Sequence, residues 1–182
     1  MILTFESYVN DDDKIFFAIQ ENDFNTVKNL IDNGYDVNKK RNFNTPLMTA
    51  VSLNSERYDI IIYLIKHGAD VNAIDNNNRS VLNWAVYVGD LKTIKLLIKY
   101  GANINIVDKY DDSLLNIAAI QSHFEILFYL LTLNNIEWYF LDKHNKFFID
   151  YLSVKYKNKI KKLYPKKYMK YLIYKKSKKF NL

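Results

Sequence analysis

Two nearly identical twelve-residue phrases decide the fold: LIKHGADVNAID at residues 64–75 and LIKYGANINIVD at residues 97–108. A rougher copy, LIDNGYDVNKKR, begins at Leu30. Each copy uses one of the four glycines of the chain, and these stand at Gly34, Gly68 and Gly101. The two intervals between these glycines differ by a single position, and such even spacing indicates a tandem repeat of one structural unit with a period of about 33 residues.

Each of these glycines follows an amphipathic segment. Leucine and isoleucine stand four and three positions before each of these three glycines, and the apolar pattern continues back through Ile60 and Ile61 in one copy and through Thr93 and Ile94 in another. This is the spacing of one helix face. Because glycine readily adopts the left-handed conformation that closes a helix, each phrase predicts a helix that ends at its glycine.

A second, shorter apolar segment precedes each of these helices. It reads DKIFFAI from Asp13, TPLMTAV from Thr45, SVLNWAV from Ser80 and SLLNIAA from Ser113. Alanine recurs at one position of this segment, at Ala18, Ala50, Ala85 and Ala118, where a neighbouring helix must approach closely. A unit of short helix, tight turn, outer helix and extended linker cannot bury its apolar face alone, so the units are expected to stack as a solenoid.

The period and these phrases together resemble the ankyrin-repeat family, whose repeats carry TPLH and GADVNA. The resemblance covers about residues 10–142 and implies an all-α solenoid of paired antiparallel helices, with β-hairpin finger loops at right angles to them. Successive fingers and inner helices would line a concave face. We expect four repeats within residues 1–142 and a degenerate fifth repeat with a Lys/Tyr-rich tail at 143–182; the four repeats lie approximately at 10–42, 43–76, 77–109 and 110–142.

Departures from the family pattern make specific predictions. The histidine of TPLH, which bonds the threonine hydroxyl in the family, is replaced by Met48, Asn83 and Asn116. Asparagine can replace that hydrogen bond, whereas methionine cannot. The fingertip glycine becomes Asn78 and Asp111, residue types that tolerate positive φ, so those turns are expected to survive. Two extra residues within SLNSERYD predict a longer turn between helices near residues 54–58.

Two finger asparagines also match the family. Asn72 and Asn105 stand where family members use asparagine to brace the hairpin, so we expect a structural role for them.

The repeat phrase decays after the fourth unit, where Asn134 stands in the place of glycine. Carrying the same period forward from core positions of the fourth unit nevertheless reaches apolar residues at Phe148, Tyr151, Ile160 and Leu163. This phase predicts a degenerate helix pair over residues 146–164 that ends at Pro165. The following PKKYMKYLIYKK favours one more amphipathic helix, with an inward face of Tyr168, Met169, Leu172 and Ile173.

Composition excludes several kinds of chemistry. The 182 residues include no cysteine, which excludes disulfides, thiolate metal sites and thiol catalysis and favours a reducing compartment. The segment MILTFESYVNDDD has no basic start, and no run of eighteen apolar residues occurs, so we expect neither a secretory signal nor a spanning helix. These features predict a cytoplasmic protein.

Candidate chemical groups mostly have structural explanations. The three histidines fall in three different units, and no nucleotide-binding, zinc-protease or nucleophile-elbow motif is present. Asp13 begins a helix, and Phe16, Phe17, Phe124 and Tyr129 follow helix stripes that predict core positions. We therefore expect no enzyme activity, no metal site and no cofactor.

Four residues are candidates for contact with a partner. Trp84 and Tyr87 share one inner helix near the side that faces the groove in the family, and Arg79 and Tyr110 lie at adjoining finger positions. Tryptophan, tyrosine and arginine are enriched at binding hot spots. The alternative is that Trp84 only packs between inner helices. The resulting hypothesis is a monomeric, non-enzymatic module that binds a partner protein through its concave groove.

The tail supplies a second hypothesis. Residues 1–150 carry 14 basic and 20 acidic residues, whereas residues 151–182 carry 12 lysines and no acid. The tail interleaves these lysines with tyrosines, as binders of nucleic acid or of an anionic membrane surface do. A capping repeat with a solvated lysine-rich face would have the same composition.

Overall fold

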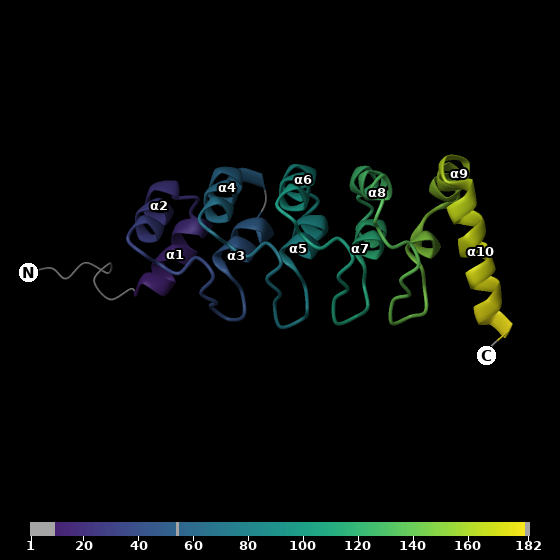
Figure 1. Ribbon diagram of the computed structural model, residues 1–182, viewed down its shortest axis with the longest axis horizontal. Coiled ribbons are helices and arrows are strands. Elements are labelled where there is room, and N and C mark those ends of the chain that lie inside the picture. Colours follow the sequence, from purple (N-terminus) through teal and green to yellow (C-terminus); the bar gives the residue numbers. More distant parts are fainter. Residues whose placement is uncertain (1–9, 54, 181–182) are drawn as a thin grey trace, which may run out of the picture.

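The computed structural model describes residues 10–53 and 55–180. Over these residues the chain forms ten α-helices and two 3₁₀ turns, which follow one another along a single axis (Figure 1). The helices are α1 (Asp11–Gln20), α2 (Phe24–Asp32), α3 (Pro46–Ser52), α4 (Tyr58–Lys66), α5 (Val81–Val88), α6 (Leu91–Lys99), α7 (Leu114–Ile120), α8 (Phe124–Leu131), α9 (Val154–Leu163) and α10 (Pro165–Phe180). The 3₁₀ turns are η2 (Ser55–Arg57) and η3 (Phe148–Tyr151).

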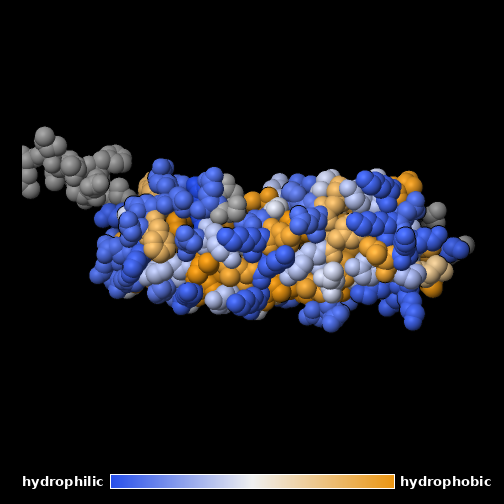
Figure 2. All heavy atoms as spheres, turned by 90° about the horizontal axis from the view of Figure 1, so that it is seen from above, coloured by the Kyte–Doolittle hydropathy of each residue, from blue (hydrophilic) through white to orange (hydrophobic). Residues whose placement is uncertain are grey.

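The helices form two rows. The inner helices α1, α3, α5 and α7 pack side by side, and η3 continues their row by packing on α7. The outer helices α2, α4, α6 and α8 form the second row, and the finger loops extend from the opposite side of the inner row (Figure 1). Seen from the side of the outer helices, hydrophilic side chains cover much of the surface and hydrophobic ones show between them along the stack (Figure 2). The predicted all-α solenoid is confirmed.

One continuous hydrophobic core runs through the stack. The four alanines of the inner segments are all buried where successive inner helices meet, as the sequence predicts. Phe16 is buried too, but the core assignment of Phe17 is wrong. The Phe17 side chain is 50% exposed and lies under the guanidinium group of Arg41, whose central carbon is 5.6 Å from the ring centre. Phe124 and Tyr129 are partly buried and pack against the core.

The outer helices end as the glycine phrases predict. Gly68 has φ +90°, and its amide donates to the carbonyl of Ile65 at 3.2 Å while the amide of Ala69 donates to Leu64 at 3.0 Å. These paired bonds satisfy carbonyls that a helix end otherwise leaves free. Gly101 has φ +88° and closes α6 in the same way.

The inner helices begin at the predicted hydroxyl residues. The Ser80 hydroxyl donates to Asn83 Oδ1 at 2.6 Å and accepts from the Asn83 amide at 3.1 Å. Ser113 and Asn116 repeat this arrangement. At Thr45 the hydroxyl accepts from the Met48 amide at 3.2 Å, but it cannot donate to residue 48, because the methionine side chain offers no oxygen. The prediction that asparagine replaces the hydrogen bond of the family histidine is confirmed at Asn83 and Asn116.

The fingers are loops with little regular pairing. Within the described residues they contain two isolated antiparallel bridges, Arg41 with Asn44 and Ile74 with Ser80. The fingertips turn at Asn78 and Asp111, whose φ values are +57° and +61°, as predicted. Asn145 makes the same turn in the following finger, with φ +56°.

The turn between α3 and α4 is longer than the others, as predicted. Five residues separate Ser52 from Tyr58, and η2 lies among them, whereas two residues separate α5 from α6. Asn54, one residue of the predicted turn, lies outside the described residues.

The fifth unit differs from the expectation in its first element. It begins with the single 3₁₀ turn η3 instead of an α-helix, whereas its second element, α9, ends before Pro165 as predicted. Phe148 and Ile160 are buried, but Leu163 is 53% exposed, so its core assignment is wrong. One extra residue lies between the end of α8 at Leu131 and Asn135, before the finger that leads to η3. Asn105 bonds to residues 135 and 137, which is one position beyond the interval set by the bonds of Asn72 to residues 101 and 103. This insertion shifts the register after the fourth unit.

α10 is present, but its rotation was predicted wrongly. Met169 and Ile173 are 55% and 64% exposed, while Tyr171 is buried and Tyr168 and Leu172 pack against the core. The Tyr171 hydroxyl donates to Asp150 Oδ1 at 2.9 Å, and its ring meets Phe147 edge to face. This anchor turns the Tyr168–Tyr171–Leu172 side inward. The repeat boundaries at residues 42, 76, 109 and 142 remain predictions.

Gly101→Val should lower the free energy of unfolding by about 1–2 kcal/mol, the cost of a left-handed conformation for a residue with a side chain. Beyond the adjacent residues, no atom lies within 4 Å of a Cβ added at Gly101, so we expect the loss to come from backbone strain and not from a clash of that carbon. Gly101→Asn is the control and should lose less, because asparagine tolerates this conformation. Urea denaturation measures both. Equal midpoints for wild type and Gly101→Val would contradict the proposed role of this glycine.

Truncation after Asp142 should cause aggregation. The shortened chain lacks η3 and so leaves the apolar side of α7 uncovered. A chain ending at Tyr164 keeps η3 and α9 and should stay folded, with a lower melting temperature. Size-exclusion chromatography and thermal melting compare the two. If the chain ending at Asp142 is soluble, monomeric and as stable as the full chain, residues 146–164 are not a cap.

Candidate partner-binding groove

Three of the four sequence-predicted binding residues form one cluster beside α5. The rings of Trp84 and Tyr87 meet edge to face, with centroids 6.0 Å apart. The guanidinium carbon of Arg79 lies 5.3 Å from the Trp84 ring centre and 6.0 Å from that of Tyr87. Arginine at such a distance is attracted to the face of an aromatic ring. The cluster is therefore an ordered group of the residue types that dominate binding interfaces.

The finger before α5 positions this cluster through one aspartate. Asp75 is buried, and its Oδ1 accepts from the amides of Asn77 at 2.7 Å and Arg79 at 3.0 Å. Its Oδ2 accepts from Trp84 Nε1 at 3.2 Å. One carboxylate thus shapes the loop that carries Arg79 and orients the indole on the helix that follows.

The cluster residues differ in how far their side chains are buried and bonded to the rest of the fold. Trp84 is half-buried and hydrogen-bonded to Asp75. Arg79 Nε lies 3.6 Å from Oδ2 of the buried Asp108, on the next finger. Tyr87 is 49% exposed, and its backbone carbonyl lies 3.1 Å from His123 Nε2. Tyr87 is therefore the member whose side chain can be removed with the least effect on folding.

Tyr110 lies apart from these three residues, on the next finger. Its amide donates to Asp108 Oδ1 at 2.8 Å, and its carbonyl accepts from the Lys143 amide at 3.1 Å. Two lysines approach its ring, with Lys143 Nζ 4.1 Å and Lys109 Nζ 5.0 Å from the ring centre. Tyr110 extends the same row of fingers without joining the aromatic cluster.

A small cavity opens beside Tyr87 between the third and fourth units. Its volume is about 60 Å³, and it is lined by Arg79, Asn83, Tyr87, Asp108, Asp112, Ile117, Ile120 and Gln121. Sequence reasoning missed Asp112 and Ile120. Their positions carried a signal, because they occupy the places in the next repeat that correspond to Arg79 and Tyr87. Ile120 is exposed like Tyr87, so successive units present an apolar side chain at the same place.

Asp112 is the electrostatically unusual residue of this cavity. Burial and then the charges of Asp108 and Asp142 raise its pKa to about 6, against the smaller opposing effects of Lys143 and His144. An unshifted aspartate titrates near 3.9. The folded protein therefore holds the Asp112 proton more tightly than the unfolded chain does.

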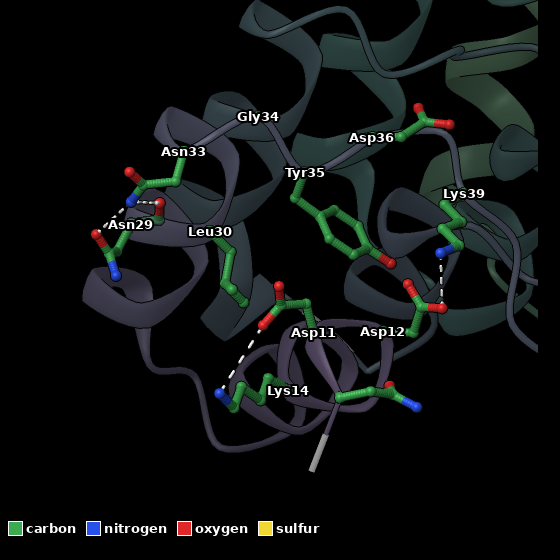
Figure 3. Close-up of a pocket in the computed structure, with 11 residues that line it drawn as sticks. Asp11, Asp12, Lys14, Asn29, Leu30, Asn33, Gly34, Tyr35, Asp36 and Lys39 are labelled. Atoms are coloured by element: carbon green, nitrogen blue, oxygen red, sulfur yellow. Dashed lines mark hydrogen bonds and ion pairs between the residues drawn. The ribbon is translucent and has the colours of Figure 1, made fainter. Parts of the chain in front are cut away.

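Another pocket lies at the N-terminal end of the described chain. It has a volume of about 630 Å³ and lies between the start of α1 and the loop after α2 (Figure 3). Two of its three acidic residues form ion pairs: Lys39 Nζ lies 2.8 Å from Asp12 and Lys14 Nζ 3.8 Å from Asp11. Burial and the charge of Asp12 raise the pKa of Tyr35, which points into this region.

The remaining candidate groups are dispersed. His67 Nδ1 lies 2.8 Å from the Tyr63 carbonyl, His123 lies beside Tyr87, and the His144 amide donates to Asp142. Across residues 10–53 and 55–180, no group of three or more histidines, aspartates or glutamates is placed to hold a metal ion. In the same part of the chain, no helix is both long enough and apolar enough to span a bilayer.

Comparison with known families agrees with this geometry. A profile described as ankyrin repeats (three copies) matches residues 15–108 and, in a second match, residues 77–142. Together these matches span more than half of the 182 residues. The chain belongs to the ankyrin-repeat family. Such repeats generally act as protein–protein interaction modules, since stacking them creates extended binding surfaces.

Two relatives share part of this repeat region. Alpha-latrotoxin-Lg1a from Latrodectus geometricus is 37% identical over 83 residues, which are 43% of this chain and 6% of the toxin. Ankyrin repeat protein L92 from Acanthamoeba polyphaga mimivirus is 40% identical over 77 residues, which are 41% of this chain and 18% of that protein. Each match covers less than a fifth of the relative, so the similarity is one of ankyrin repeats.

Asp112→Asn should stabilise the protein at neutral pH but not in acid. The raised pKa makes the wild-type carboxylate unfavourable as pH rises from about 4 to about 6, and the amide avoids this cost. Solvent screening reduces the effect, so we expect about 1 kcal/mol, or a melting temperature about 2–4 °C higher at pH 7.5, and no difference at pH 4. Asp111→Asn makes the same change at the exposed fingertip and is the control. A gain that persists unchanged at pH 4 would contradict the electrostatic explanation.

Proposed function

We propose that this ankyrin-repeat protein binds a partner protein through the groove between its fingers and inner helices. The observation that carries the proposal is the ordered cluster of Arg79, Trp84 and Tyr87 beside the exposed Ile120. Tyr110 extends this surface to the next finger. Aromatic and arginine side chains supply a large share of binding energy at protein interfaces, provided they are held in place before the partner arrives.

The charge of this surface defines the partner further. The fingers at residues 69–80 and 102–113 carry five aspartates against one arginine and one lysine, and α5 and α7 carry no charged residue. The groove therefore combines an apolar wall from the inner helices with an acidic rim from the fingers. A partner segment with apolar and basic side chains matches both.

We further propose a non-enzymatic, monomeric role in the cytoplasm, in which the repeats act as a scaffold for the partner. The acidic groups of the groove support a non-enzymatic role, because the carboxylates of Asp75 and Asp108 already accept bonds from backbone amides and contact a neighbouring side chain. The absence of cysteine fits a reducing compartment.

A second candidate is binding of nucleic acid or an anionic membrane surface by the basic tail. The observation that favours it is the charge of residues 151–182, which contain 12 lysines and no acid. The tail then acts apart from the groove, so the two candidates predict different sensitive residues.

Tyr87→Ala should weaken partner binding about thirtyfold, corresponding to about 2 kcal/mol for a central aromatic contact, with little change in melting temperature. Tyr100→Ala is the matched control, because Tyr100 is 42% exposed but ends the outer helix α6. The partner is first identified by affinity purification and mass spectrometry and then titrated as a purified protein by calorimetry. Tyr110→Ala extends the test to the next finger.

Arg79→Ala and Trp84→Ala are less decisive variants. Each also removes a partner of a buried finger aspartate, so they should lower stability as well as affinity. If Tyr87→Ala and Tyr110→Ala bind like wild type, the groove assignment is wrong. Loss of binding only when residues 165–182 are removed would then favour the tail.

A further inference from the structure

α10 forms the C-terminal end of the stack (Figure 1). Its inward side, formed by Tyr168, Tyr171 and Leu172, is fixed to the body. The Tyr171 hydroxyl donates to Asp150, Lys175 pairs with the same carboxylate, and the Tyr139 hydroxyl donates to the Lys167 carbonyl at 3.2 Å. The helix is thus held by one side, and the other side is left to solvent.

The outward side of α10 joins two features. Met169 and Ile173 are one helical turn apart, so they form an aliphatic stripe, and both are more than half exposed. Lys166 and Lys170 form a parallel row beside this stripe, each three residues before one of the aliphatic residues. An exposed aliphatic stripe beside a row of lysines is the pattern of a helix that lies in a lipid–water interface.

The charge on this end is not neutralised by the body. Among the described residues, the ion pair of Lys175 with Asp150 is the one that joins a tail lysine to a carboxylate. Lys170 lies over the rings of Tyr139 and Tyr174 and keeps its positive charge. Phosphatidylserine and other anionic headgroups complement this charge, and each lysine near such a surface strengthens binding about fivefold.

We infer, as a specific form of the second candidate function on which this inference rests, that the outward side of α10 docks on an anionic lipid surface. Met169 and Ile173 would insert among the headgroups, with Lys166 and Lys170 beside lipid phosphates and carboxylates. The exposed aliphatic groups favour lipid over nucleic acid. Nucleic-acid surfaces use aromatic rings for stacking, but Tyr168 and Tyr171 face the body and Tyr174 packs on Tyr139 with centroids 5.2 Å apart.

The test uses the full-length chain and sedimentation with large unilamellar vesicles. Vesicles of phosphatidylcholine and phosphatidylserine at 3:1 should bind at least tenfold more tightly than pure phosphatidylcholine at 0.1 M salt. The double variant Met169→Ser, Ile173→Ser keeps every charge and should bind the anionic vesicles at least tenfold more weakly. Val154→Ser, which changes an exposed aliphatic residue of α9, should bind like the wild type. Lys166→Glu, Lys170→Glu should abolish the preference for phosphatidylserine.

Several outcomes would overturn the inference. Equal binding to the two vesicle types, or no binding to either, would show that α10 does not recognise an anionic lipid surface. Unchanged binding by the double serine variant shows that the aliphatic stripe does not insert. Tighter binding to duplex DNA or single-stranded RNA, lost in the glutamate variant and kept in the serine variant, identifies a nucleic-acid surface instead. Tyr87→Ala should leave vesicle binding unchanged, so failure here and failure of the groove proposal are distinguishable.

Discussion

The stack depends on one side-chain amide per unit, which ties each finger to the next. The Asn72 Nδ2–H donates to the Gly101 carbonyl at 3.2 Å, and Asn72 Oδ1 accepts from the Asn103 amide at 2.8 Å. Asn38 makes the same pair of bonds to Gly68 and Asp70, and Asn105 makes them to residues 135 and 137. Each of these asparagines thus bonds the finger of its own unit to the turn that closes the outer helix of the next unit. In the phrase GADVNA at residues 68–73, Gly68 ends a helix and accepts a bond from the finger before it, while Asn72 bonds to the unit that follows. The phrase therefore recurs with the period of the fold.

Finger aspartates form a second repeated set of bonds, which shapes the loops of the proposed groove. Asp75, Asp108 and Asp142 each use Oδ1 to bind the amides two and four residues later, while Oδ2 takes a different partner in each finger: Trp84, Arg79 and Tyr151. For Asp142, burial opposes ionisation, but the bonds from the Tyr151 hydroxyl and the backbone amides outweigh it and lower the pKa. Asp112 has no such donors among the described residues, and its pKa rises. The proposed groove thus places structural carboxylates, whose hydrogen bonds are satisfied within the fold, next to the Asp112 carboxylate, which accepts no such bonds among the described residues.

Sequence periodicity predicted the parts of this fold that depend on local rules. A glycine at a helix end, an asparagine at a fingertip and a serine before an inner helix each act within a few residues, and all were found where expected. The rotation of α10 could not be predicted in this way, because the Tyr171 bond to Asp150 that sets it joins residues 21 positions apart. In the groove, Trp84 and Tyr87 could be paired by helical spacing. The position of Asp112 follows from the repeat, since it corresponds to Arg79, but its raised pKa could not be predicted, because that arises from burial and from the charges of Asp108 and Asp142.

The two proposed surfaces are carried by different elements and have opposite charge. The proposed groove lies on the middle units, with an acidic rim, whereas the lysine-rich helix α10 forms the C-terminal end of the stack (Figure 1). Repeats contact only their neighbours, so a change at α10 reaches α5 only through the units between them. Because the two surfaces share no element, a ligand on one of them leaves the other accessible. If α10 rests on an anionic bilayer, the acidic fingers are repelled by the same lipid charge that attracts the tail, and the stack should project from the surface with its groove open to a partner.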